Sequence, residues 1–135
     1  MYQQMIFVNL AVDDLDASKK FFTELGYSIN AQFSDENTAS VVISDAIVAM
    51  LHTKQRYAEF TKKEIADSAK TSEVLLALSS ESREQVDELV EKAVAAGGSV
   101  SGETQDQGFM YGRAFDDPDG HTWEIVWMDP SVVKG

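Results

Sequence analysis

The chain has 135 residues, enough for one domain with a real core or for two small fused modules, and with 44% hydrophobic and 25% charged residues its composition is ordinary for a globular protein. Its formal net charge of −12 argues against nucleic acid or an anionic membrane as a partner, because both are polyanions that bind through Lys and Arg. The sequence has no cysteine, no apolar run of the roughly 18–20 residues that a membrane span needs, and no evident secretory signal, so a cytoplasmic protein is expected.

The first half of the chain predicts a strand, a helix and three further strands. The apolar run Met5–Val12 suits a buried strand. Asp13 and Asp14 can each cap a helix, and Gly26 stands where a left-handed residue commonly ends one, so a helix is expected from about Asp14 to Leu25. The strands expected next are Ser28–Ser34, Thr38–Ile43 and Ile47–His52.

A polar, lysine-rich connector, Thr53–Thr71, follows, with a short helix expected around Lys54–Phe60. Tyr57 and Phe60 are three residues apart on that helix. They could line a cavity or pack on the body of the domain, and packing is the favoured alternative.

The second half repeats the same order of elements. Glu73–Leu78 is an apolar strand, and Ser82 with Gln85 three residues later is a capping-box signal. Apolar residues then recur at helical spacing from Val86 until Gly97-Gly98 ends the helix. The strands expected after it are Ser99–Thr104, Phe109–Phe115 and His121–Met128.

This internal repeat predicts an α+β fold of two tandem βαβββ modules, at about residues 5–52 and 72–128, with the connector at about 53–71. Each module can bury one sheet face under its helix and leave the other concave. Joined, the concave faces would form a curved mixed sheet around a central cavity.

The stretch Asp116–Gly120 predicts a tight turn between two strands, because Pro118 sets φ and Gly120 tolerates positive φ. In the strand that follows, Glu124 shares a face with Val126 and Met128, opposite the large ring-bearing residues. This carboxylate therefore points either to solvent or into a cavity.

Four segments of the chain follow a pattern known from one family: Phe7–Phe22, Leu25-Gly26-Tyr27, Gly112-Arg113 and Asp116–Glu124. Through them the chain resembles the vicinal oxygen chelate superfamily, which includes glyoxalase I, bleomycin-resistance proteins, fosfomycin-resistance enzymes and extradiol dioxygenases. The resemblance covers about residues 5–128 and implies a single glyoxalase-like domain over residues 1–135. It also implies a homodimer, which is the usual state in this superfamily. The segment Gly108–Arg113 further resembles a bacterial glyoxalase-like subgroup often labelled lactoylglutathione lyase-related.

The resemblance implies up to four side chains that hold a divalent metal ion on the concave faces. In the first module the first position falls on Phe7. The second falls on Met50, or on Ala49 if the alignment gap is placed differently, and none of these side chains suits the metals of this family. In the second module they fall on Glu73 and Glu124, so the metal set is incomplete. His52 could act as a displaced ligand, but a surface position at the strand end is the favoured expectation for it.

Two roles for the glutamates without a metal stay open. A close pair of carboxylates raises one pKa, so Glu73 and Glu124 could supply a general base, and they could equally bind an ammonium or guanidinium group. Alternatively Glu73 is solvated and Glu124 pairs with Arg113 on the neighbouring strand. Arg113 could also bind a carboxylate or phosphate group of a ligand, but pairing with Glu124 is the favoured expectation for it.

Candidate pocket residues are Phe7, Asn9, Met50, Phe109, Tyr111 and Arg113, because small-molecule sites combine aromatic walls with a few polar groups. For Phe7, Asn9, Phe109 and Tyr111, simple core packing is the favoured alternative. The expected function is binding of a small organic molecule. As an enzyme, the protein would be a lactoylglutathione lyase-like lyase or isomerase that removes a proton α to a carbonyl, with Glu124 and Glu73 as catalytic residues. The alternative is a non-catalytic protein that sequesters its ligand, as in antibiotic resistance.

Overall fold

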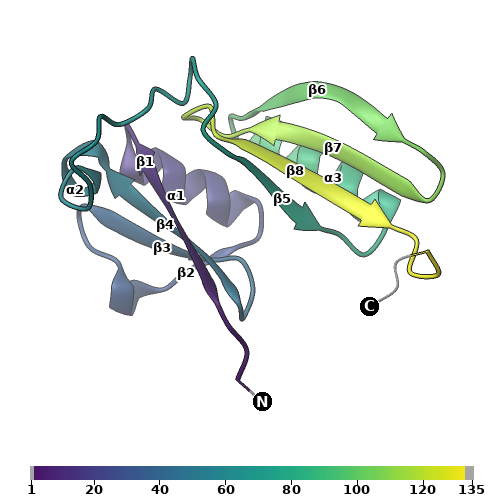
Figure 1. The fold of residues 1–135 in the computed structure, drawn as a ribbon, viewed down its shortest axis with the longest axis horizontal. Coiled ribbons are helices and arrows are strands. Elements are labelled where there is room, and N and C mark those ends of the chain that lie inside the picture. The colour runs from purple at the N-terminus through teal and green to yellow at the C-terminus, as the bar shows by residue number, and fades with distance from the viewer. Residues whose placement is uncertain (1, 133–135) are drawn as a thin grey trace. The chain divides into compact units, whose positions relative to one another are not determined.

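The computed structural model describes residues 2–132, which form two structural units divided between Ala66 and Asp67 (Figure 1). Each unit has the element order βαβββ, so the predicted tandem modules and the α+β class are confirmed. None of the helices among the described residues is long and apolar enough to cross a membrane.

The elements of the first unit are β1 (Ile6–Val12), α1 (Leu15–Glu24), β2 (Ser28–Ile29), the 3-10 turn η1 (Ala31–Phe33), β3 (Thr38–Val42), β4 (Ile47–Thr53) and α2 (Lys54–Tyr57). Those of the second are β5 (Leu75–Ser79), α3 (Arg83–Ala95), β6 (Ser99–Asp106), β7 (Met110–Asp116) and β8 (Thr122–Met128).

The two sheets follow one plan. The first has the strand order β1-β4-β3-β2 and the second β5-β8-β7-β6. In each, the first strand of the module runs parallel to the last, and the other neighbours are antiparallel. A parallel pair needs a long crossover connection, and here the helix and the two intervening strands supply it.

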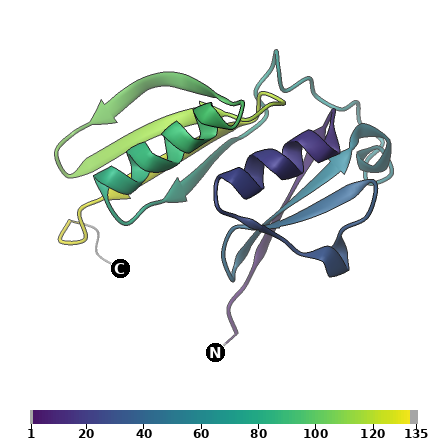
Figure 2. The same ribbon diagram turned by 180° about the vertical axis from the view of Figure 1, so that it is seen from behind.

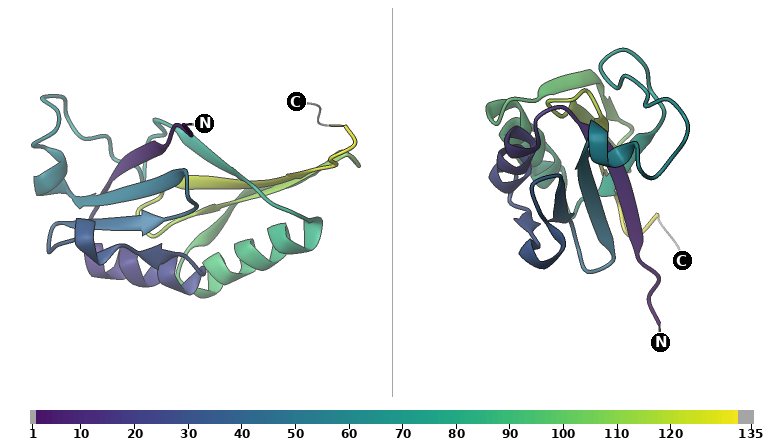
Figure 3. Two further views of the ribbon diagram at one scale, coloured as in Figure 1. Left: turned by 90° about the horizontal axis from the view of Figure 1, so that it is seen from below. Right: turned by 90° about the vertical axis from the view of Figure 1, so that its left-hand side faces the viewer.

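One helix covers one face of each sheet, as Figures 2 and 3 show for each unit. Phe21 and Phe22 of α1 are buried, with their rings edge to face at 5.0 Å between centroids. In the second unit, Val86 and Val90 of α3 are buried together with aromatic residues of the sheet, among them Trp123. We call the face opposite the helix the open face of each sheet.

Both long helices begin where the sequence predicts. The Asp14 carboxylate accepts a hydrogen bond from the backbone N–H of Ala17 at 3.1 Å, and the Ser82 hydroxyl accepts one from Gln85 at 3.1 Å. Each cap satisfies an N–H that has no partner within the helix. Gly26 follows α1 with a φ of 106°, a left-handed conformation that glycine adopts without steric cost.

The turn before β8 is built around Asp117, which is 5% exposed. One oxygen of its carboxylate accepts the backbone N–H groups of Asp119 and His121, each at 3.0 Å, and the other accepts the indole N–H of Trp123 at 3.1 Å. Burial raises the pKa of Asp117, while His121 and these hydrogen bonds oppose the rise. The expected turn is thus confirmed, and it is tied to the core through Trp123.

The expected strand Ser28–Ser34 is mostly wrong, because only Ser28–Ile29 pairs with β3. The Asn30 side chain accepts the backbone N–H of Gln32, and the Ser34 hydroxyl donates to the Asn30 carbonyl at 2.6 Å. These local hydrogen bonds compete with a strand ladder and favour the 3-10 turn.

Candidate functional site

The open face of the second sheet carries Glu124. Strand register places Glu124 between Ala114 of β7 and Ala77 of β5, whereas its chain neighbours Trp123 and Ile125 are buried on the helix side. The carboxylate is half-buried, and within residues 2–132 it makes no ion pair or hydrogen bond. It is therefore free to interact with a bound molecule.

The expected pair between Arg113 and Glu124 is wrong. Arg113 is in register with Ile125, so its side chain lies on the opposite face from Glu124 and reaches α3. There its guanidinium donates to the Asp87 carboxylate at 3.0 Å, and the Tyr111 hydroxyl donates to the same oxygen at 2.7 Å. The pKa of Asp87 lies below its usual value, chiefly because of the hydrogen bond from Tyr111 and further because of the one from Arg113.

A cavity of about 420 Å³ lies against the open face around Glu124. This volume is within the range of small-molecule sites, roughly 300–1,000 Å³. The lining combines apolar and polar groups and includes a second carboxylate, Glu103. The lining residues are Ser72, Leu75, Ser101, Gly102, Glu103, Gln105, Met110, Gly112, Arg113, Ala114, Thr122, Glu124 and Val126.

Strand β6 supplies a wall of this cavity that was not predicted from the sequence. The pairing of β6 with β7 shifts register between Ser101 and Gln105, and Gly102 within this bulge has a φ of 68°. A bulge bends its strand and re-aims nearby side chains, here next to Glu103. A glycine inside an expected strand is the sequence signal for such a bulge.

The other predicted site residues of the second module lie apart from Glu124. Glu73 is exposed and precedes β5, which begins at Leu75. Phe109 is exposed at the turn before β7, and Tyr111 points its hydroxyl to α3. Among the described residues, none of these three lines the cavity, and Arg113 borders it with its guanidinium bound elsewhere.

The open face of the first sheet carries Phe7, Asn9 and Met50. Asn9 is the register partner of Met50, and Phe7 lies two residues earlier on β1. Phe7 is 56% exposed, Asn9 is exposed and Met50 is half-buried.

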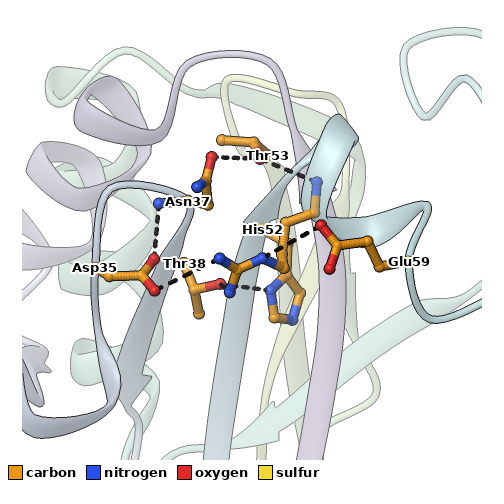
Figure 4. Close-up of polar contacts among 7 residues, drawn as sticks. Asp35, Asn37, Thr38, His52, Thr53 and Glu59 are labelled. Carbon is orange, nitrogen blue, oxygen red and sulfur yellow. Dashed lines mark hydrogen bonds and ion pairs between the residues drawn. The ribbon is translucent and has the colours of Figure 1, made fainter.

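His52 is not at the surface, which corrects the expectation of an exposed strand end. It is 3% exposed, its Nδ1 lies 2.9 Å from the Thr38 hydroxyl, and its Nε2 lies 2.7 Å from Oδ1 of Asn9. Figure 4 shows His52 and Thr38 facing each other across neighbouring strands. Burial lowers the pKa of His52, and the nearby Arg56 lowers it further.

The favoured packing role of the connector aromatics agrees with this arrangement. The rings of Phe60 and Tyr57 lie edge-on to the imidazole of His52, at 5.0 and 6.4 Å between centroids. Phe60 itself is still largely exposed.

Comparison with known proteins agrees with the observed fold. The sequence model described as Glyoxalase/Bleomycin resistance protein/Dioxygenase superfamily matches residues 4–125. The chain belongs to this superfamily. Comparison with curated proteins gives no match.

Solved structures with the same superfamily fold span nearly the whole chain. A hypothetical protein, SA1046 from S. aureus, is 30% identical with a TM-score of 0.78, and the match covers 94% of each chain. A glyoxalase-related enzyme from Fulvimarina pelagi is 26% identical with a TM-score of 0.76, over 93% of this chain and 88% of that one. A bleomycin resistance determinant encoded on the transposon Tn5 is 16% identical with a TM-score of 0.65, over 94% and 99%, and at this identity it supports the fold alone.

The metal site that the superfamily resemblance implies does not fit the residues present here. Two of the four positions carry Phe7 and Met50, and neither a phenyl ring nor a thioether suits Ni²⁺ or Zn²⁺. Glu73 lies outside β5, and the described residues contain no cluster of three or more His, Asp or Glu side chains able to hold a metal ion. We therefore assign no role to a metal in this protein.

Proposed function

We propose that this superfamily member binds a small organic molecule that carries a cationic or hydrogen-bond-donating group, in the cavity on the open face of the second sheet. The observation that carries the proposal is the Glu124 carboxylate, which lines this cavity without a protein partner among the described residues. Glu103 adds a second negative charge, and the guanidinium of Arg113 is bound to Asp87 on the helix side.

The chemistry of the lining supports this ligand class. Ammonium and amidinium groups form charge-assisted hydrogen bonds with carboxylates, which are roughly twice as strong as neutral ones. Leu75, Met110 and Val126 offer apolar surface to the rest of the molecule. The protein would then act by holding its ligand, in the manner of a sequestering protein.

Benzamidine is a suitable probe, because it joins an amidinium to an apolar ring. We expect wild-type protein to bind it in isothermal titration calorimetry, and Glu124→Gln to weaken binding about tenfold or more, since the charge is lost while size is kept. The matched control is Glu73→Gln, which removes a carboxylate outside the cavity lining and should leave the affinity unchanged. Equal affinity in wild type and Glu124→Gln would refute the proposal.

A second candidate, an isomerase or lyase acting α to a carbonyl, is favoured by the same unpaired carboxylate. Glu124 would take the proton from the hydroxyl-bearing carbon to give an enediolate and return it to the neighbouring carbonyl carbon, while the hydroxyl proton moves to the former carbonyl oxygen. The hemithioacetal of methylglyoxal and glutathione is the first substrate to test, by chromatographic detection of lactoylglutathione. No turnover by wild type, or turnover unchanged by Glu124→Gln, would remove this candidate while leaving ligand binding intact.

The homodimer and the cytoplasmic location expected from the sequence belong to the same proposal. Light scattering coupled to gel filtration tests the first, and cell fractionation the second.

A further inference from the structure

A hydrogen-bonded chain with a buried centre crosses the open face of the first sheet. It runs from Arg56 through Thr38 and His52 to Asn9, with donor–acceptor distances of 3.4, 2.9 and 2.7 Å in that order. Thr38 is 5% exposed and His52 is 3% exposed, so both depend on protein partners. The chain rests on the first unit alone and is independent of the cavity around Glu124.

The direction of the chain follows from the Thr38 hydroxyl. Arg56 is always protonated and can only donate, so the hydroxyl oxygen accepts from it. Within the described residues, the imidazole Nδ1 of His52 is the acceptor available to the hydroxyl proton. A buried hydroxyl proton without an acceptor is costly, so Nδ1 accepts, and the proton of the neutral ring resides on Nε2.

This tautomer in turn orients Asn9. Because Nε2–H donates at 2.7 Å, the Asn9 atom that faces it must be the carbonyl oxygen Oδ1. The amide nitrogen of Asn9 then points away from His52 on an exposed residue, and no hydrogen bond to it is present within residues 2–132. An amide whose oxygen accepts a hydrogen bond is polarised, and its N–H groups become stronger donors.

We infer that Asn9 is a donor site for an oxygen atom of a small organic ligand, and that His52 is the positioning residue that holds it. A carbonyl or carboxylate oxygen would accept from Nδ2 of Asn9. The apolar part of the ligand would lie on Phe7 and Met50, the residues beside Asn9 on the same face.

The first test is the tautomer of His52, read from ¹⁵N chemical shifts and two-bond ¹H–¹⁵N couplings of the wild-type protein at neutral pH. We expect the proton on Nε2. A proton on Nδ1 would overturn the proposal, because Nε2 would then accept from the Asn9 NH₂ group, which would turn toward His52 and leave the carbonyl oxygen of the amide facing outward. This measurement needs no variant and therefore does not depend on how a variant folds.

The second test is ligand binding, with acetophenone as the probe because it joins one carbonyl acceptor to an apolar ring. The side-chain NH₂ signals of Asn9 are followed in ¹H–¹⁵N spectra during titration. We expect them to shift in a saturable way in wild type.

The decisive variant is Asn9→Asp, which keeps an oxygen for Nε2–H of His52 but has no N–H to donate. We expect acetophenone to bind at least about fivefold more weakly, the loss of one hydrogen bond. Asn37→Asp, at another asparagine of the first unit that accepts through Oδ1, is the control and should bind as wild type does. Unchanged affinity in Asn9→Asp, or an unshifted Asn9 signal in wild type, would overturn the proposal.

The positioning role of His52 is tested by two further variants. His52→Gln keeps an N–H donor toward Asn9, and His52→Leu does not. We expect affinity for acetophenone close to wild type in the first and reduced in the second, together with averaged Asn9 NH₂ signals. If His52→Gln and His52→Leu bound acetophenone equally well, the positioning role of His52 would be refuted. The tautomer measurement would then decide whether Asn9 is the donor site.

Discussion

Arg83, the first residue of α3, joins three separate parts of the second unit. Its guanidinium donates to both carboxylate oxygens of Asp106, at 2.9 and 3.0 Å, and to the carbonyl of Gly108 at 2.8 Å. Its guanidinium carbon also lies 5.1 and 5.3 Å from the ring centroids of Tyr111 and Trp127. One side chain thereby fixes the turn between β6 and β7 to the start of the helix.

The pH dependence of this ion pair follows from the pKa of Asp106, which the hydrogen bond from Arg83 lowers to about 2. An unfolded Asp has a pKa of about 3.9, so the stabilisation is fully present above about pH 4 and is lost as the pH falls through about 2. We expect Arg83→Met to reduce the free energy of unfolding at pH 7, and the reduction to shrink between pH 4 and pH 2. Urea denaturation of both proteins across this range measures it.

The control for this prediction is Lys92→Met, which removes an exposed pair with Glu88 at 3.5 Å within α3. Exposed pairs of this kind contribute about 0.3–0.5 kcal/mol, so this variant should change stability little at any pH. A difference between wild type and Arg83→Met that does not shrink at acid pH would show that Asp106 is not its partner in solution.

Among single residues, the face occupied by Glu124 could be predicted, but the partner of Arg113 could not. Alternation along β8 determines that Glu124 lies opposite Trp123. The pairing of Arg113 depends on the register of β7 and on the position of Asp87 along α3, and neither is a local property of the sequence.

At the scale of elements, the connector is tied to the turn before β8. The Ser68 hydroxyl donates to the carbonyl of Asp119 at 2.7 Å. A Cβ added at Gly120 would lie 2.6 Å from the carbonyl oxygen of Ser68 and 2.9 Å from the Cα of Ala69. Gly120 also has a φ of 87°, so glycine is required there for two independent reasons.

Gly120→Ala should therefore be far more destabilising than Gly102→Ala, measured by urea denaturation. Gly102 is the matched control, because its φ of 68° imposes a similar left-handed strain while nothing lies within 4 Å of an added Cβ. That strain costs roughly 1–2 kcal/mol, and at Gly120 the clash with backbone adds to it. Equal losses in the two variants would mean that the connector does not rest on this turn in solution.

At the scale of the whole molecule, the residues at the four implied metal positions predict that the wild-type protein has no specific site for a divalent metal ion. In isothermal titration with Ni²⁺, we expect wild-type protein to show no saturable site, because Phe7 and Met50 supply no ligand. A saturable Ni²⁺ site in wild type would contradict this expectation, and the Glu73→Gln/Glu124→Gln variant would show whether these carboxylates form it.

The sequence by itself determined the repeat, the helix caps, the turn before β8 and the membership of the superfamily, because each depends on residues close together in the chain. Tertiary structure alone decided which polar groups have partners. His52 has its hydrogen bonds to Asn9 and Thr38 on two other strands, and Arg113 has its partner on a helix 26 residues away. Such pairings depend on strand register and helix docking, and for that reason the free carboxylate of Glu124 and the oriented amide of Asn9 emerged only from the folded chain.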